Sequence, residues 1–495
     1  MLNSDISPYF KKLAQDLWHA HDATPNHFIG LITDARFYLD EPFTSIEKLV
    51  DAVQRATRVM TLHHGGLLGN DEFAAAYDKH YFPLWSSHAP LKADPALQEG
   101  LANRLYNIDE QKTDTHASLI IGNGSNDIIR PIIERLRARS IPMQFEIADH
   151  DFTRLAVNHM DEQGLKNYAA YSISLSEKLT NRIIAVPSSN PPHTIEKDKE
   201  KHEAYAELIK PMRERVLSGA VMSTLTFFPT PIDAEIDGIP YQDYLKLFFE
   251  LCDQPDAQIE KANDFLIEKL NKTTELRFTN DDGTDVRMSL VDHDGRHFTF
   301  ANSQTRRNVP GSEVFSAPRV DSVNGVIVSK GKFLAIQDET KQVVNLTRHF
   351  EDGVMVSFTA EEGEEHFQEF LDLHPNHARV GEIGIGTNPH LKRHVANGLL
   401  VEKISSSFHT AQGDAYTMTD YLGTPVHMNN GNKARMHWDI TTMLGDMYLD
   451  GECILKDGVF LPPELDVLNR GWNAVPAEER PDRWKDYKGP YTGPV

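Results

Sequence analysis

Imidazole and carboxylate groups gather in four short segments in the second half of the chain. His437 and Asp439 stand two residues apart in the segment MHWD, and side chains at i and i+2 of a β-strand point to the same face. The other three segments supply His409, Glu382 and Glu313. Glu382 ends an apolar run between two glycines, and Glu313 follows a Pro-Gly turn signal. These spacings predict that the segments present metal ligands.

Two histidines and three carboxylates, with no cysteine, form the ligand set of a hydrolytic site that holds zinc, cobalt or manganese. Two ions bridged by a carboxylate also fit this set. A divalent ion lowers the pKa of a bound water and polarises an amide carbonyl, while a carboxylate passes the proton to the leaving amine. Any one of these residues alone is more often a core or rim residue, so the prediction depends on the joint pattern.

The same segments resemble the metal-binding motifs of a known family. NVPGSEVFSAP, VGEIGIGTN, FHTAQGDAY and HWD follow one another with 69, 27 and 28 residues between their first ligands. This order and these spacings are similar to those of the thermophilic metallo-aminopeptidases, the aminopeptidase T and aminopeptidase S family. The resemblance runs from about residue 114 to the HWD segment and is sharpest after residue 276.

The resemblance implies an aminopeptidase that releases N-terminal residues from peptides or cleaves a related small amide through a metal-activated water. It implies two divalent metal ions held by five residues: Glu313, Glu382, His409, His437 and Asp439. Glu382 is the candidate for bridging the ions or for general-base catalysis. Tyr416 is expected near the scissile bond, where it hydrogen-bonds the oxyanion or substrate or packs beside His409. Since relatives are dimers with enclosed sites, a homodimer is expected as well.

The segment before His409 departs from the family pattern. Many relatives carry an acidic residue five positions before the first metal histidine, whereas here that position is Ile404 and the nearest acid is Glu402. Three serines, Ser405 to Ser407, stand where some relatives carry a glycine pair. The role of Glu402 stays open, and the added bulk predicts an altered substrate choice.

A second chemistry uses part of the same ligand set. His409, His437 and Asp439 also satisfy the facial triad of non-haem Fe(II) oxygenases, and some ring-cleaving pyridinediol dioxygenases resemble this aminopeptidase fold. Glu313 and Glu382 argue against this alternative, because a mononuclear iron site needs no further pair of carboxylates. Metal stoichiometry and oxygen uptake separate the two classes.

The elements that position these residues predict an α/β protein in three parts. Residues 1–114 have helical periodicity, with one helix opening at Ser7-Pro8, and form an N-terminal helical layer. Residues 115–274 begin with a β-strand, a glycine turn, an amphipathic helix and a second strand, which is a βαβ unit of an α/β domain. Residues 275–495 are rich in strand and turn signals and form a mixed, β-rich metal-binding domain.

Composition narrows the class of protein and its partners. The 73 acidic and 50 basic residues give a formal charge of −23, which disfavours nucleic acid and acidic membrane surfaces as partners. Two cysteines in 495 residues argue against a disulfide framework and fit a reducing compartment. The start of the sequence lacks the features of a signal peptide, and no run approaches the length of a membrane span. A cytoplasmic enzyme is therefore expected.

Overall fold

The computed structural model describes residues 46–489, apart from residues 90, 92, 110–113, 142, 190–192, 218–219, 305–306 and 444. The chain divides into two compact units: unit 1 is Met1–Pro187 with Pro192–Phe228, and unit 2 is Ser188–Pro191 with Pro229–Val495. The helix expected at Ser7-Pro8 lies outside the described residues. The expected domain boundaries after residues 114 and 274 stay predictions, whereas the mixed α/β class is confirmed.

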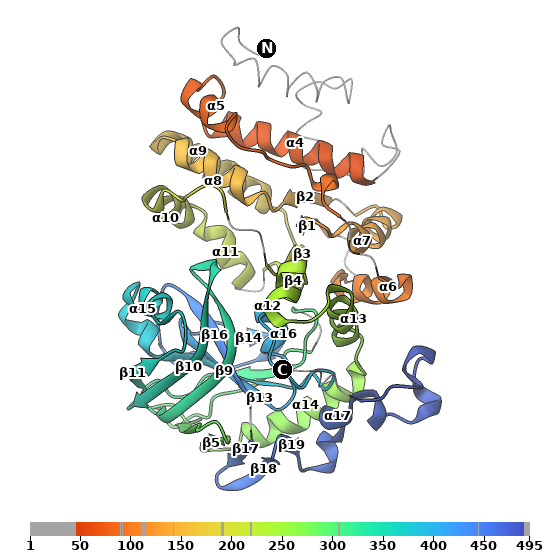
Figure 1. The fold of residues 1–495 in the computed structure, drawn as a ribbon, viewed down its shortest axis with the longest axis vertical. Coiled ribbons are helices and arrows are strands. Elements are labelled where there is room, and N and C mark those ends of the chain that lie inside the picture. The colour runs from red at the N-terminus through yellow and green to blue at the C-terminus, as the bar shows by residue number, and fades with distance from the viewer. Residues whose placement is uncertain are drawn as a thin grey trace. The chain divides into compact units, whose positions relative to one another are not determined.

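Unit 1 is built around a four-stranded sheet in the order β2-β1-β3-β4, in which every pair is parallel (Figure 1). The strands are β1 Ala117–Ile121, β2 Met143–Ile147, β3 Asn181–Pro187 and β4 Met222–Phe228. Parallel neighbours need crossover connections, which helices provide. These helices are α7 Asn126–Ala138, α8 His150–His159, α9 Glu162–Ser176, α10 Lys199–Leu208 and α11 Lys210–Leu217. The βαβ unit expected from residue 115 is confirmed.

Helices also precede this sheet, as the periodicity predicts. They are α4 Ile46–His64, α5 Asp71–Tyr77, the 3-10 helix η1 Trp85–Ser87 and α6 Pro95–Leu105. Asn70 caps α5 by accepting a hydrogen bond from the Phe73 amide at 2.8 Å, which satisfies a donor that the helix leaves unpaired. Leu62 and Phe73 pack against Phe152 in one apolar cluster, so burial of apolar faces holds α4 and α5 against α8.

Unit 2 contains an eight-stranded sheet in the order β11-β10-β9-β6-β5-β17-β18-β19. Its strands are β5 Glu275–Thr279, β6 Asp285–Ser289, β9 Asn324–Ala335, β10 Asp338–Glu351, β11 Val354–Thr359, β17 Asp446–Leu449, β18 Glu452–Lys456 and β19 Val459–Phe460. All its pairs are antiparallel. Short turns join several consecutive strands, as the Asn-Asp-Asp-Gly signal between β5 and β6 predicts.

A five-stranded antiparallel sheet in the order β16-β13-β12-β8-β7 forms the second layer of unit 2. Its strands are β7 Ala301–Asn302, β8 Glu313–Ser316, β12 Val380–Gly386, β13 Ser407–Gly413 and β16 His437–Met443. Phe278 of β5 stacks on Phe408 of β13 with ring centroids 4.2 Å apart, within an apolar core that draws on both sheets. One face of the small sheet is thereby packed on the larger sheet, which leaves its other face for polar side chains.

Helices and short strands complete unit 2. The helices are α12 Pro231–Asp237, α13 Tyr241–Cys252, α14 Asp256–Leu270, α15 Glu364–Asp372, α16 Gly398–Val401 and α17 Asp466–Arg470, and the strands β14 Asp420–Tyr421 and β15 Thr424–Pro425 form a hairpin. Within the described residues, unit 2 also contains five 3-10 helices: η2 Pro375–Ala378, η3 Pro463–Leu465, η4 Gly471–Ala474, η5 Ala477–Glu479 and η6 Asp482–Trp484.

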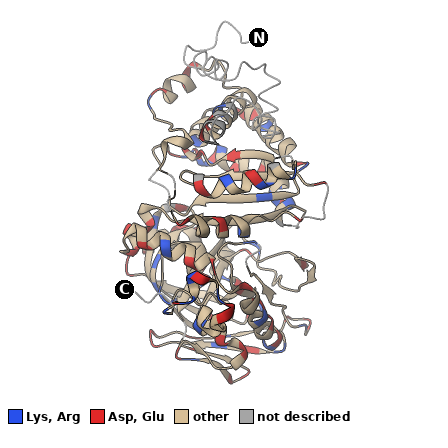
Figure 2. Ribbon diagram, turned by 90° about the vertical axis from the view of Figure 1, so that its right-hand side faces the viewer, with Lys and Arg blue, Asp and Glu red and all other residues tan. Residues whose placement is uncertain are grey.

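Charged residues are spread along both units. Figure 2 shows acidic and basic segments interspersed on the ribbon. No helix within the described part of the chain is long and apolar enough to cross a membrane.

Candidate metal centre

The register of the small sheet places all five expected ligands on one of its faces. Directly opposed residues of an antiparallel pair share a face, as do residues i and i+2 of a strand. Glu382 on β12 opposes Ala411 on β13, which opposes Asp439 on β16. Counting in steps of two from these residues reaches His409 and His437, and Glu313 on β8 opposes Gly386 on the same face of β12.

The side chains on this face converge. His437 Nε2 lies 2.7 Å from Glu382 Oε2 and 3.4 Å from Asp439 Oδ1. His409 Nε2 lies 3.6 Å from Glu313 Oε2 and 3.7 Å from Glu382 Oε1. Glu382, His409 and Asp439 each offer one ligand atom, and these three atoms lie within 4.8 Å of one another. The side chains of His437 and Asp439 keep 25% and 27% of their surface exposed, so the cluster opens to solvent on their side.

Glycines on β12 explain how these strands approach so closely. A Cβ atom on Gly384 would lie 2.1 Å from Cε1 of the His409 ring, because the two residues oppose one another. No side chain larger than hydrogen fits at that distance. The GEIGIG pattern therefore makes room for the imidazole as well as presenting Glu382.

Several atoms of the cluster lack the hydrogen bonds that buried polar groups normally make. Among the described residues, His409 Nδ1 and Asp439 Oδ1 are buried without a hydrogen-bond partner, and Glu382 Oε2 and His437 Nε2 lie against one another at 2.7 Å. Nδ1 of His437 lies 2.7 Å from the carbonyl oxygen of Asp414 and can donate to it, which directs the lone pair of Nε2 into the cluster. Unpartnered donor atoms of this kind fit a divalent cation.

The electrostatics of the cluster favour positive charge. Burial lowers the pKa of His409, but Glu382, Asp439 and Glu313 outweigh burial and raise the pKa to about 9. An imidazole that keeps its proton this far above the ordinary value marks a strongly negative site. The donor set and this field together fit the divalent cation that the sequence predicts.

The structure adds two residues that the sequence did not assign to the site. Lys403 Nζ lies 2.5 Å from Glu313 Oε1 and 2.7 Å from Glu402 Oε1. Burial raises the pKa of Glu402 to about 7, against the opposing effect of Lys403. Glu402, whose role the sequence left open, thus faces Lys403. In the sequence, Glu402 and Lys403 are an acid next to a base, just before the apolar segment of His409. The sequence pattern around them does not show whether their side chains point inward or outward.

Tyr416 lies at the edge of the cluster. Its ring centroid is 5.2 Å from that of His437 and 5.3 Å from that of Phe315. Burial, followed by the charge of Glu382, raises the pKa of the phenol well above its usual value. Tyr416 is therefore neutral and packs beside His437, not beside His409, and its place near the scissile bond stays a prediction.

A second group of potential ligands lies near the surface, with Asp294 exposed and Asp292 and His427 half-buried. Asp292, Asp294 and His427 also bring ligand atoms within 4.8 Å of one another. Asp294 forms an ion pair with Arg296 at 2.7 Å, so this group already holds a cation.

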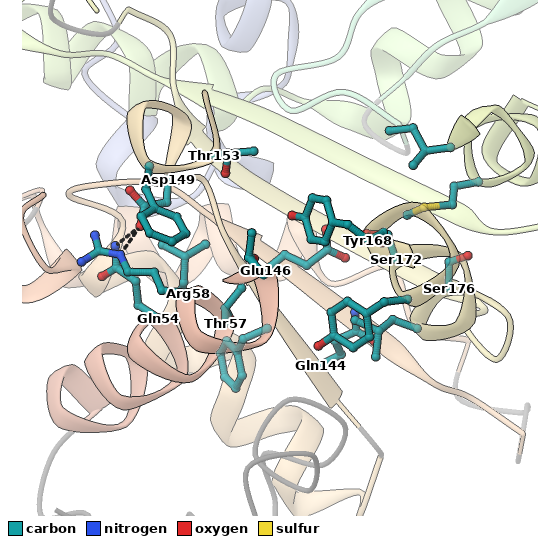
Figure 3. A pocket seen from close by; sticks show the side chains of 18 of the residues that line it. Gln54, Thr57, Arg58, Gln144, Glu146, Asp149, Thr153, Tyr168, Ser172 and Ser176 are labelled. Carbon is teal, nitrogen blue, oxygen red and sulfur yellow. Dashed lines mark hydrogen bonds and ion pairs between the residues drawn. The ribbon is translucent and has the colours of Figure 1, made fainter. Parts of the chain in front are cut away.

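Unit 1 contains a cavity of about 330 Å³, and this cavity is not at the metal cluster. Its lining includes Glu146 and three tyrosines, two of which, Tyr168 and Tyr205, stack with centroids 5.1 Å apart. Figure 3 shows Arg58 and Gln54 directed at Asp149 at one end of the cavity. These contacts are 2.6 Å and 3.0 Å long, so the charges at that end neutralise one another.

Comparison with known proteins matches the chain to one family. The model of the family described as thermophilic metalloprotease (M29) matches residues 118–471. Aminopeptidase T of Thermus aquaticus is 26% identical over 295 residues, which are 54% of this chain and 69% of that protein. Aminopeptidase 2 of Geobacillus stearothermophilus is 24% identical over 356 residues, or 63% of this chain and 83% of that protein.

One solved structure shares the fold. Wild-type AmpT from Thermus thermophilus aligns with a TM-score of 0.56 and 20% sequence identity, covering 75% of this chain and all of that one. The matched region of the family model contains the five-stranded sheet that carries the cluster and the eight-stranded sheet packed on its other face.

Proposed function

Because this chain belongs to the thermophilic metalloprotease (M29) family and is a metal-dependent aminopeptidase, we propose that the five-residue cluster of unit 2 is its hydrolytic centre. The observation that carries the proposal is the convergence of two histidines and three carboxylates from four neighbouring strands. Membership of a peptidase family also supports hydrolysis over the dioxygenase alternative.

The chemistry of the donors indicates the metal. Imidazole and carboxylate without thiolate suit zinc, cobalt or manganese, and we propose one of these ions here. When bound, the metal activates a water and polarises the scissile amide carbonyl. The family resemblance implies two such ions. Lys403, however, contacts Glu313, one of the five expected ligands.

Glu382 is the proposed proton carrier of the reaction. It accepts a proton from the attacking water as the new C–O bond forms, and it donates that proton to the leaving amine as the C–N bond breaks. The two oxygens of Glu382 lie 3.7 Å from His409 Nε2 and 2.7 Å from His437 Nε2. These imidazoles fix the carboxylate on the face where the substrate has to bind.

Tyr416 is the proposed hydrogen-bond donor to the carbonyl oxygen of the substrate. A neutral phenol beside His437 can stabilise negative charge that develops on this oxygen. Phe315 packs on the other side of the ring and limits its movement.

The substrate is proposed to be a small peptide or related amide, and the enzyme a cytoplasmic homodimer. Cys252 and Cys453 form no disulfide, which agrees with a reducing compartment. The helices before residue 106 carry none of the cluster residues, and we propose that they contribute to subunit contacts. Light scattering at micromolar concentration measures the assembly, and a monomeric mass would contradict the dimer.

The function of the cluster is tested by metal removal and substrate choice. We expect chelation to abolish hydrolysis of aminoacyl anilides and dipeptides, and zinc, cobalt or manganese to restore it. N-acetylated versions of the same substrates should resist cleavage because an aminopeptidase requires a free N-terminus. Full activity after the metal is shown to be gone would remove the proposed centre.

A further inference from the structure

A lysine ammonium lies inside the carboxylate cluster. Lys403 Nζ contacts Glu313 and Glu402 at 2.5 Å and 2.7 Å, and only 1% of its side chain is exposed. Glu313 is one of the residues that the family resemblance assigns to a metal ion. In this chain, that carboxylate already has a cation.

The ammonium and a divalent ion compete for the same carboxylate. A metal such as zinc binds a carboxylate oxygen at about 2.0–2.2 Å, so an ion on Glu313 would come close to Nζ. Like charges repel more strongly in a buried site, where water screens them less. Glu313 therefore favours one of the two cations over the simultaneous binding of both.

The backbone that carries Lys403 is fixed against the end of β12. The Asn388 amide donates to the Lys403 carbonyl at 2.7 Å, and the Ser405 amide donates to the Asn388 carbonyl at 2.8 Å. A Cβ atom on Gly386 would lie 2.2 Å from the Ile404 carbonyl oxygen. Since the turn is held on both sides of Lys403, the Cα of this residue has a fixed place beside the cluster, and only 1% of its side chain is exposed there.

The remaining donors already suffice for one ion. Glu382, His409 and Asp439 converge within 4.8 Å, and His437 Nε2 lies against Glu382 and Asp439. Two imidazoles, the Asp439 carboxylate and one oxygen of Glu382 can supply the protein ligands of one ion, which leaves room for a water on the metal and the second oxygen of Glu382 for the proton. Glu313 stands beside this set, with Oε2 3.6 Å from His409 Nε2.

We propose that the Lys403 ammonium takes the place of one of the two metal ions, so that this chain binds a single divalent ion through Glu382, His409, His437 and Asp439. Glu313 and Glu402 then hold the lysine. This inference rests on the proposed function, since it concerns the number of ions in the same centre.

Metal stoichiometry of the unmodified chain is the first test. The full-length protein is stripped with a chelator, reloaded with excess zinc, passed through a desalting column, and assayed by plasma mass spectrometry against protein concentration from amino-acid analysis. We expect one zinc per chain. Two zinc ions per chain would overturn the inference and leave the proposed function standing, whereas a chain that binds none of zinc, cobalt and manganese would overturn both.

Substitution of Lys403 is the second test. Lys403→Met removes the charge, keeps a similar length, and should raise the zinc content from one to two per chain, whereas Lys403→Arg should leave it at one. The matched control is Lys392→Met, because Lys392 is a half-buried lysine of the same unit whose Nζ contacts Ser406 Oγ at 2.9 Å. This control should keep one ion per chain. A content of one in folded Lys403→Met would show that the lysine does not set the number of ions.

Discussion

The two polar interiors of this chain, the metal cluster of unit 2 and the cavity of unit 1, differ in how their charges are satisfied. In the cavity, Asp149 accepts hydrogen bonds from Arg58 and Gln54, and Glu146 accepts one from Ser118. In the cluster, the carboxylates of Glu313, Glu382 and Asp439 all lie within 4.0 Å of a single imidazole nitrogen, Nε2 of His409, so negative charge is in excess.

The difference separates a structural polar network from a functional one. Buried polar groups that bond to one another stabilise a fold, whereas unsatisfied groups raise its free energy unless something binds them. A cavity volume alone therefore does not locate the chemistry of this chain. The excess of carboxylates around His409 supports the cluster as the site of that chemistry, since these are the residues that the family motifs mark.

The largest expected effect comes from Glu382, at the centre of the unsatisfied network. Glu382→Gln keeps the shape of the side chain but cannot accept the proton, so kcat/KM should fall by about a hundred- to ten-thousand-fold. The melting temperature should change little. Hydrolysis of a dipeptide measures the loss, with Glu365→Gln on the exposed face of α15 as the control. Activity near that of the control would reject Glu382 as the proton carrier.

A smaller loss is expected from the glycine that admits the His409 ring. Gly384→Ala places a methyl group 2.1 Å from that ring, so the ring must move, and zinc affinity should fall by about 10- to 100-fold, as it does when a ligand loses its support. Competition with a chromophoric chelator measures this affinity.

The control for this variant is Gly398→Ala, since no atom lies within 4 Å of the added Cβ there. Equal affinities for the two alanine variants would show that the close approach of β12 and β13 does not position His409.

A substitution in the cavity of unit 1 should lower the stability of the protein and leave its metal binding unchanged. Arg58→Met leaves Asp149 without its buried ion pair, which is expected to cost about 3–5 kcal/mol of unfolding free energy. Urea unfolding measures the cost, and zinc content should stay unchanged in the folded protein. Arg130→Met, which removes an exposed pair with Glu47, should cost less than about 1 kcal/mol. A loss of zinc in Arg58→Met would undo the distinction between the two interiors.

The smallest effect is expected at the exposed acidic group. Asp294→Asn removes one of the three potential ligands beside His427, but its partner Arg296 is solvent-exposed and such pairs contribute little. Zinc content and melting temperature should both match those of the unmodified chain. A drop in zinc content would reveal a second metal site there.

Much of the fold and the family could be predicted from local patterns. Local patterns predict the helices and strands from residue 115 and the strands and turns after residue 275. They do so because the spacing of apolar residues within a short segment shows whether a helix or a strand can bury them. The two-residue spacing of His437 and Asp439 likewise specifies a shared face once the segment is a strand. The motifs around Glu313, Glu382 and His409 were enough to identify the family.

The sequence by itself thus identified the family and predicted which residues carry the chemistry. Only the tertiary structure shows that the His409 ring occupies the space beside Gly384 and that the Lys403 side chain lies between Glu313 and Glu402. The physical reason is that the first contact depends on the register of β12 and β13, whereas the second depends on a turn that is hydrogen-bonded to Asn388. A turn has no periodicity from which the direction of its side chains could be predicted.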